Sequence, residues 1–184
     1  MVYLFLGNGF EEAEAVIPCD LLRRAGVEVR TVGLNGPVIT GGHGITLAAD
    51  CALSELDPAA AEMVILPGGL GGVRSIRTCP GALDAVRAVH TAGGYVAAIC
   101  AAPTILAELG LTAGRRATCY PGMEPEMGDA CMCPEGAVTD GKIITGMAAG
   151  TAFDFALALI SALRGAAAAE TVARAIFYKG GNHV

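Results

Sequence analysis

A cysteine in the stretch YVAAICAAPTILAELG, residues 95–110, has the surroundings of a catalytic nucleophile. Cys100 follows an apolar run typical of a buried strand, and Pro103, tolerated in a first helical turn, favours a helix directly afterwards. Ala98 and Ala102 create the pattern A-x-C-x-A, a small-residue counterpart of the G-x-S-x-G elbow. We therefore predict an elbow where helix N–H groups lower the thiol pKa; the alternative is a small buried core residue.

An acidic run near the N-terminus offers a partner for such a thiol. The segment GFEEAE contains Glu11, Glu12 and Glu14. These acids either occupy the first turn of a helix, which the helix dipole favours, or place one carboxyl beside Cys100. A carboxyl next to a thiolate would be kept protonated by like charge and burial, so it could donate a hydrogen bond to sulfur and move protons.

The sequence PGG at 67–69 follows another apolar run and offers backbone donors. Gly68 and Gly69 permit close approach of the backbone, and together with the Ala101 N–H they could stabilise an oxyanion. The alternative is an ordinary glycine turn.

The remaining cysteines and histidines are weaker candidates. Cys119 with Cys131 and Cys133 could form a metal set, but the spacing matches no standard zinc pattern and no histidine is near, so we expect no metal. His43 would reach a site only if its glycine-rich hairpin folds over one. The others are expected in the core, beside loops, on a helix surface or in the C-terminal tail: Cys19, Cys51, Cys79, His90 and His183.

Length and composition predict one soluble domain over residues 1–184. The chain is 53% hydrophobic and 16% charged, which argues against disorder and favours a sheet buried on both faces. The net charge of −6 and the lack of a basic cluster make nucleic acid an unlikely direct ligand. An odd number of cysteines, seven, without an export signal is typical of free thiols in the reducing cytoplasm.

One apolar segment, 146–163, has about the length of a membrane span. Asp154 in its middle and its many small residues favour a buried or interfacial helix instead, so we expect no membrane association. The N-terminus turns acidic after its apolar run and lacks a basic start, which predicts a first strand rather than a signal peptide.

Apolar runs alternate with helical patterns along the chain. We predict strands at 2–6, 27–34, 62–66, 95–99 and 116–120, hairpins within 36–50 and 137–146, and helices at 11–26, 81–93, about 101–109, 148–163 and 168–177. Pro18 predicts a kink or break in the first helix. This alternation is typical of a parallel sheet covered on both faces, whose ligands bind beyond the carboxyl ends of the strands.

Four segments in combination resemble the ThiJ/PfpI superfamily: GFEEAEAVIPCDLLRRAG, VILPGG, AAICAAPTILAELG and GTAFDFALALISAL. The resemblance runs from residue 1 to about 177. It implies an α/β fold of the flavodoxin-like, class I glutamine amidotransferase-like kind, a three-layer sandwich with a mostly parallel central sheet and helices on both faces. It further implies that Cys100 is the nucleophile, that Glu14 hydrogen-bonds it, and that Gly68, Gly69 and Ala101 line the site.

The resemblance also implies a homodimer and a cofactor-free reaction on small α-oxoaldehydes. Several positions depart from the family pattern. Ala101 stands where protease-like branches have histidine, which lowers the peptidase reading. Tyr120 replaces a histidine, Met147 stands near a missing arginine, and His43 replaces another arginine. Tyr120 and His43 are therefore candidates for lining the site.

The leading expectation is a glyoxalase or deglycase acting on methylglyoxal, glyoxal or their early glycation adducts through a cysteine hemithioacetal. The first alternative is a non-enzymatic oxidative-stress sensor or chaperone that uses the same thiol. The second alternative is a cysteine hydrolase of amide or other C–N bonds.

Overall fold

A seven-stranded sheet runs through the middle of the computed structural model, which describes residues 1–180. Its strand order is β10-β11-β7-β6-β1-β2-β5, and every neighbouring pair is parallel except β10 with β11. The strands are β1 (Val2–Leu6), β2 (Val29–Gly33), β5 (Cys51–Ala52), β6 (Met63–Leu66), β7 (Tyr95–Ile99), β10 (Ala137–Asp140) and β11 (Ile143–Gly146).

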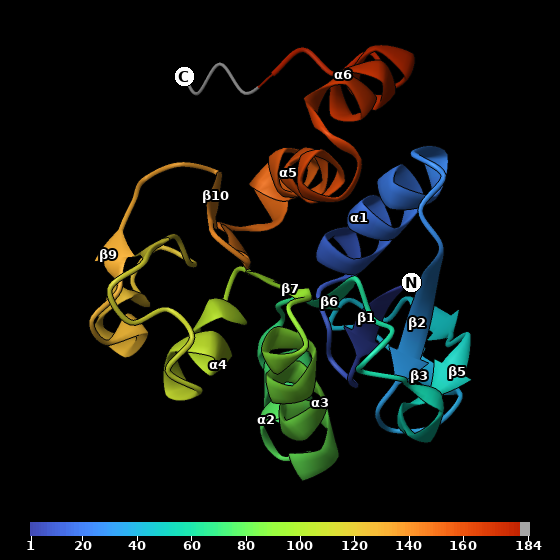
Figure 1. Ribbon diagram of the computed structural model, residues 1–184. Helices are drawn as coiled ribbons and strands as arrows, with labels where there is room; N and C mark the ends of the chain where they lie inside the picture. Colours follow the sequence, from blue (N-terminus) through green and yellow to red (C-terminus); the bar gives the residue numbers. More distant parts are fainter. Residues whose placement is uncertain (181–184) are drawn as a thin grey trace.

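Helices cover both faces of this sheet and create three layers (Figure 1). One layer contains α1 (Glu12–Arg24), α5 (Ala152–Arg164) and α6 (Ala166–Ala175). The other contains α2 (Leu70–Arg77), α3 (Pro80–Thr91) and α4 (Pro103–Glu108). The predicted flavodoxin-like α/β sandwich is therefore confirmed.

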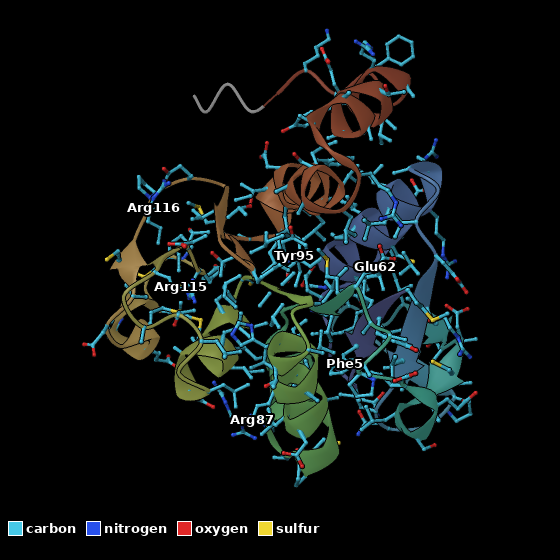
Figure 2. The ribbon with its side chains drawn as sticks, in the orientation of Figure 1. Phe5, Glu62, Arg87, Tyr95, Arg115 and Arg116 are labelled. Atoms are coloured by element: carbon cyan, nitrogen blue, oxygen red, sulfur yellow. The ribbon has the colours of Figure 1, made fainter. Side chains whose placement is uncertain are left out.

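The central strands are apolar at every position because both of their faces are buried. Along β1 the side chains alternate between the two layers: Leu4 packs in the core on the α1–α5 side, whereas Phe5 packs in the core on the α2–α3 side. Figure 2 shows Phe5 below the sheet, toward α3.

Two small additions flank the main sheet. The predicted hairpin within 36–50 is present as β3 (Val38–Thr40) and β4 (Thr46–Ala48). A separate pair joins β8 (Arg116–Ala117) to β9 (Cys131–Met132) in parallel. Three short 3-10 helices complete the described chain, at Leu53–Glu55, Glu124–Met127 and Ala149–Thr151.

Three expectations about individual elements need correction. The 116–120 strand ends after two residues, because the Thr118 N–H donates to the Thr145 hydroxyl and the Tyr120 N–H donates to the Cys100 carbonyl. Helix α2 was not predicted, since its LGGVRSIR sequence opens with glycines that disfavour helix. Helix α1 is not broken at Pro18; it continues to Arg24, and its packing against α5 outweighs the lost hydrogen bond.

No helix in the described range is long and apolar enough to span a membrane. The apolar 146–163 segment instead contains the end of β11, a 3-10 turn and the 13-residue α5. Of the three histidines, His183 lies outside the described residues.

Two phenylalanines of α5 test how much the helix layer stabilises the sheet. Phe155 is fully buried, whereas Phe153 is 38% exposed and stacks on Tyr178 at 5.8 Å between ring centroids. We predict that Phe155→Ala lowers the free energy of unfolding by about 3–5 kcal/mol, because it leaves a core cavity. The matched control, Phe153→Ala, should cost only about 1 kcal/mol, since it removes one exposed ring contact. Urea denaturation measures both, and similar losses would contradict this picture of the layer.

Candidate active site

Cys100 occupies the sharp turn between β7 and α4. The strand ends at Ile99, the helix begins at Pro103, and Cys100 itself has a φ of 66°. This left-handed conformation is strained for a non-glycine residue, and it persists only where surrounding contacts hold it. Two backbone hydrogen bonds do so: the Cys100 N–H donates to the Gly146 carbonyl (3.0 Å), and its carbonyl accepts from the Tyr120 N–H (2.8 Å).

Glu14, in the first turns of α1, is the carboxyl that reaches this cysteine. Its side chain is fully buried, and its Oε2 accepts a hydrogen bond from the Gly68 N–H at 2.8 Å. Its Oε1 has no partner of normal hydrogen-bond geometry within residues 1–180, whereas the Cys100 thiol acts on its pKa as a hydrogen-bond partner. Burial dominates and raises the pKa of Glu14 to about 7.

Gly68 brings the carboxyl and the thiol together. A Cβ atom at this position would lie 2.4 Å from Glu14 Oε2 and 2.7 Å from the Cys100 Cβ, so only glycine fits. Gly69 has a φ of 81°, and a Cβ there would lie 2.5 Å from the Glu11 backbone nitrogen. The PGG segment, which follows β6, therefore packs closely against the residues that follow β1 and β7 and is not a simple turn.

The electrostatics of the thiol differ from the expectation of a helix-lowered pKa. Burial comes first, and with the Glu14 carboxylate it raises the pKa of Cys100 to about 12. Helix α4 has six residues and starts at Pro103, so its dipole opposes burial weakly. Since the pKa of Glu14 is raised to about 7 and that of Cys100 to about 12, the pair loses its first proton near pH 7, chiefly from the carboxyl, and keeps the second, chiefly on the sulfur.

Two backbone N–H groups act on the sulfur as hydrogen-bond donors, those of Ala101 and Gly69, and both lower the pKa of Cys100. They could equally stabilise an oxygen anion formed next to the sulfur. The Gly68 N–H, in contrast, is already committed to Glu14. Of the predicted backbone donors, the Gly68 N–H therefore binds the Glu14 carboxyl, and the Ala101 and Gly69 N–H groups act on the Cys100 sulfur.

His43 and two of the acids form what we call the acidic rim: Glu11, Glu12 and His43. The β3–β4 hairpin folds back on the start of α1, so that His43 Nδ1 lies 2.9 Å from Glu12 Oε2 and 3.5 Å from Glu11 Oε2. The His43 N–H also donates to Glu12 Oε1 at 2.7 Å. Among residues 1–180 no hydrogen bond joins His43 to Cys100, and the Nδ1 atom of its imidazole faces the two acids.

Glu12 is a buried residue whose role the sequence did not reveal. Despite burial, which acts in the opposite direction, hydrogen bonds from His43 and Ile45 lower the pKa of Glu12 to about 2. Its carboxylate therefore ties the hairpin to α1. No pattern could have identified this bond, because its partners are 31 residues or more apart in the sequence.

The other predicted lining residue, Tyr120, contacts the site through its backbone. Its side chain is 49% exposed. A cavity of about 370 Å³ that is open to solvent has Met147, Cys119 and Cys133 among its lining residues. Within residues 1–180, Glu11, Glu12 and His43 are the one group whose candidate metal-ligand atoms all lie within 4.8 Å of one another. The set of Cys119, Cys131 and Cys133 does not meet that criterion.

The fold and the elbow define a class: a flavodoxin-like α/β protein whose cysteine lies at the carboxyl end of the sheet beside a buried carboxyl. The comparison with protein families is consistent with that class, since the DJ-1/PfpI family matches residues 1–162. The chain belongs to the DJ-1/PfpI family.

Relatives extend over nearly the whole chain. Protein dj-1beta of Drosophila melanogaster is 36% identical over 176 residues, 94% of each chain. A deglycase of Pyrococcus abyssi is 32% identical over 68% of this chain and 75% of its own, and a glutathione-independent glyoxalase of Caenorhabditis elegans is 29% identical over 84% and 83%.

Solved structures agree with the fold. A cysteine-to-alanine mutant of a DJ-1 superfamily protein from Salmonella typhimurium has a TM-score of 0.92 at 33% identity and covers 97% of this chain and 98% of its own. DJ-1 of Toxoplasma gondii, described as oxidized, has a TM-score of 0.93 at 28% identity, with 97% and 98% covered.

The shared proton predicts the pH dependence of thiol reactivity. In the wild type, the rate at which iodoacetamide alkylates Cys100 should rise as the pH passes about 7, because the pair then loses its first proton. In Glu14→Gln this transition should disappear, leaving one at higher pH that burial of the thiol determines. Peptide mass spectrometry follows Cys100 separately from the other cysteines. A wild-type profile without a transition near pH 7 would argue against the coupled pair.

Proposed function

We propose that the protein is a cofactor-independent glyoxalase or deglycase acting on small α-oxoaldehydes such as methylglyoxal, or on their early glycation adducts. The observation that carries the proposal is the buried Glu14 carboxyl beside Cys100: both border the space that Gly68 leaves open, and burial raises the pKa of Glu14 to about 7. Near neutral pH this group can both give and take a proton. The names of the Pyrococcus and Caenorhabditis relatives support the same chemistry.

The first step forms a carbon–sulfur bond. The Cys100 thiolate, in the state of the pair in which Glu14 holds the proton, attacks the aldehyde carbon of methylglyoxal. The carbonyl electrons move to oxygen, where the Ala101 and Gly69 N–H groups can stabilise the charge. Glu14 then donates its proton to that oxygen, which leaves a neutral hemithioacetal and a Glu14 carboxylate.

The second step is an internal redox rearrangement that needs no external oxidant. The Glu14 carboxylate removes the proton from the former aldehyde carbon, giving an enediolate. The hydroxyl proton then moves from the first oxygen to the second, and Glu14 returns its proton to the neighbouring carbon. The aldehyde carbon is thereby oxidised to a thioester while the ketone carbon is reduced to an alcohol. Water then attacks the thioester, the carbon–sulfur bond breaks, and lactate leaves together with one proton.

A deglycase reaction would pass through the same hemithioacetal. An early adduct of methylglyoxal with an amine or thiol has its aldehyde carbon bound to nitrogen or sulfur, and Cys100 would replace that group. The released amine or thiol takes up a proton, and the subsequent steps are unchanged. The same two residues, Cys100 and Glu14, therefore serve both activities.

Lactate formation from methylglyoxal tests the proposal. We expect Cys100→Ala to reduce lactate production to background, because no hemithioacetal can form. Glu14→Gln should lower kcat by roughly 10²–10⁴-fold, the usual contribution of a general acid–base group. Cys131→Ala, at an exposed cysteine on β9, is the matched control and should retain full activity. Equal activity in wild type and Cys100→Ala would overturn the assignment.

An oxidation sensor is the second candidate, and the oxidized Toxoplasma neighbour favours it. Here peroxide adds oxygen atoms to the Cys100 sulfur, first to sulfenic and then to sulfinic acid, with the Ala101 and Gly69 N–H groups and Glu14 as hydrogen-bond partners. We expect mild peroxide to add two oxygen atoms, located at Cys100 by peptide mass spectrometry. Uniform oxidation of all seven cysteines would remove the basis for a sensor.

Amide hydrolysis has less support. A cysteine hydrolase needs a base that can protonate a leaving amine, and histidine commonly serves. Ala101 directly follows the nucleophile, and the imidazole of His43 is held by Glu12. The site instead offers a carboxyl, which suits proton transfer on carbon.

A further inference from the structure

We propose that the Cys100 site selects uncharged α-oxoaldehydes and disfavours substrates that carry a carboxylate or phosphate, with Glu11 as the specificity-determining residue. The substrate class rests on the proposed function. The underlying electrostatic preference concerns the Cys100 sulfur itself and can be measured without turnover.

Glu11 lies directly against the two glycines that border the sulfur. Its backbone N–H donates to the Gly68 carbonyl at 3.0 Å, and a Cβ on Gly69 would come within 2.5 Å of the same nitrogen. Its side chain is 23% exposed, whereas Glu14 is fully buried. The charge of Glu11 is felt at Glu14, whose pKa it helps to raise.

The acidic rim carries more negative than positive charge. His43 lies between two acids, 3.5 Å from Glu11 and 2.9 Å from Glu12, so a single imidazolium faces two carboxylates. Even with His43 protonated, one negative charge remains in excess. Above about pH 7 the Glu14–Cys100 pair contributes another, because it then holds one proton between two acidic groups.

No cation in the described chain acts on the pair to offset this charge. The charged groups that influence Glu14 and Cys100 are each other and Glu11. Arg77, on α2, pairs with Glu108 and Thr104. Arg87 lies on α3, while Arg115 and Arg116 lie by the β8–β9 pair (Figure 2); they form ion pairs with Asp84, Asp140 and Glu135.

A substrate anion at Cys100 would therefore meet like charge at close range. One such charge a few ångströms away, partly exposed to water, changes a rate by roughly tenfold. Because the rim is open to solvent, added salt should weaken the effect. An uncharged aldehyde of the same size would be unaffected.

Two alkylating reagents that share a leaving group measure this preference directly. Iodoacetate is an anion and iodoacetamide is neutral; with both, the thiolate forms a carbon–sulfur bond as iodide leaves. Cys131, exposed on β9, is the internal reference within the same molecule. We expect the iodoacetate-to-iodoacetamide rate ratio to be at least about tenfold lower at Cys100 than at Cys131, and to rise toward that of Cys131 in 0.5–1 M salt.

Glu11→Gln should raise the ratio at Cys100 by roughly tenfold, whereas Glu11→Asp should keep it low. Glu170→Gln, at an exposed acid paired with Arg174 on α6, is the matched control and should change nothing. Equal ratios at Cys100 and Cys131, or a ratio that Glu11→Gln leaves unchanged, would overturn the proposal.

A pair of substrates then tests the functional consequence. The α-oxoaldehyde 4,5-dioxopentanoate and its methyl ester differ in one remote charge. We expect kcat/KM to favour the ester by roughly tenfold in wild type and by much less in Glu11→Gln. If the protein turns over neither of these compounds nor methylglyoxal, the proposed function is refuted. The alkylation ratios would still decide the charge preference. Equal kcat/KM values in wild type would refute charge selection while leaving the proposed function intact.

Discussion

The contact between the Glu14 carboxyl and the Cys100 thiol is the constraint to which the rest of the site is adapted. Burial and like charge disfavour the loss of both protons from two acidic groups that lie side by side, so both pKa values rise and the pair keeps one proton near neutral pH. Such a contact is unfavourable unless neighbouring donors compensate it. The Gly68 N–H binds the carboxyl, and the Ala101 and Gly69 N–H groups act on the sulfur. The fold supplies all three donors at the carboxyl ends of parallel strands.

Holding this contact requires close packing of β1, β6 and β7. The three strands are neighbours in the parallel sheet, so their carboxyl ends meet at one edge. The positive φ of Cys100 aims its side chain at the space that Gly68 leaves open. Since that conformation is strained, the bonds to Gly146 and Tyr120 are needed to maintain it. The buried helix layers keep the edge rigid.

The same contact makes ionisation of the Cys100 thiol depend on Glu14 and not on the helix dipole alone. A helix dipole alone would lower the thiol pKa and favour the thiolate. Here burial and the carboxylate oppose ionisation, so the thiolate forms only together with a protonated Glu14. In the proposed reaction, transfer of one proton from the thiol to Glu14 generates both the nucleophile and the acid. The proposed charge preference depends on the neighbouring acidic rim, so the same few carboxylates would govern both properties.

The sequence by itself determined the central strands of the sheet, most of the helices and the elbow. These follow from local chemistry: unbroken apolar runs in β1, β6 and β7, small residues around Cys100, and Pro103 at the start of α4. The glycines near the start of α2 have low helix propensity, so the local sequence did not predict this helix. Burial of its apolar side stabilises it, and that burial depends on the tertiary structure. The same limit explains why Pro18 did not break α1.

Only the tertiary structure decided how the three acids divide their roles. Glu11, Glu12 and Glu14 look alike in sequence. In the structure Glu11 faces His43 at the acidic rim, Glu12 binds the β3–β4 hairpin, and Glu14 is buried against the thiol. Those differences arise from partners 31 to 86 residues away, as with Glu12 and His43 or Glu14 and Cys100. The sign of the Cys100 pKa shift has the same origin, since desolvation depends on everything packed around a group and not on its neighbours in the chain.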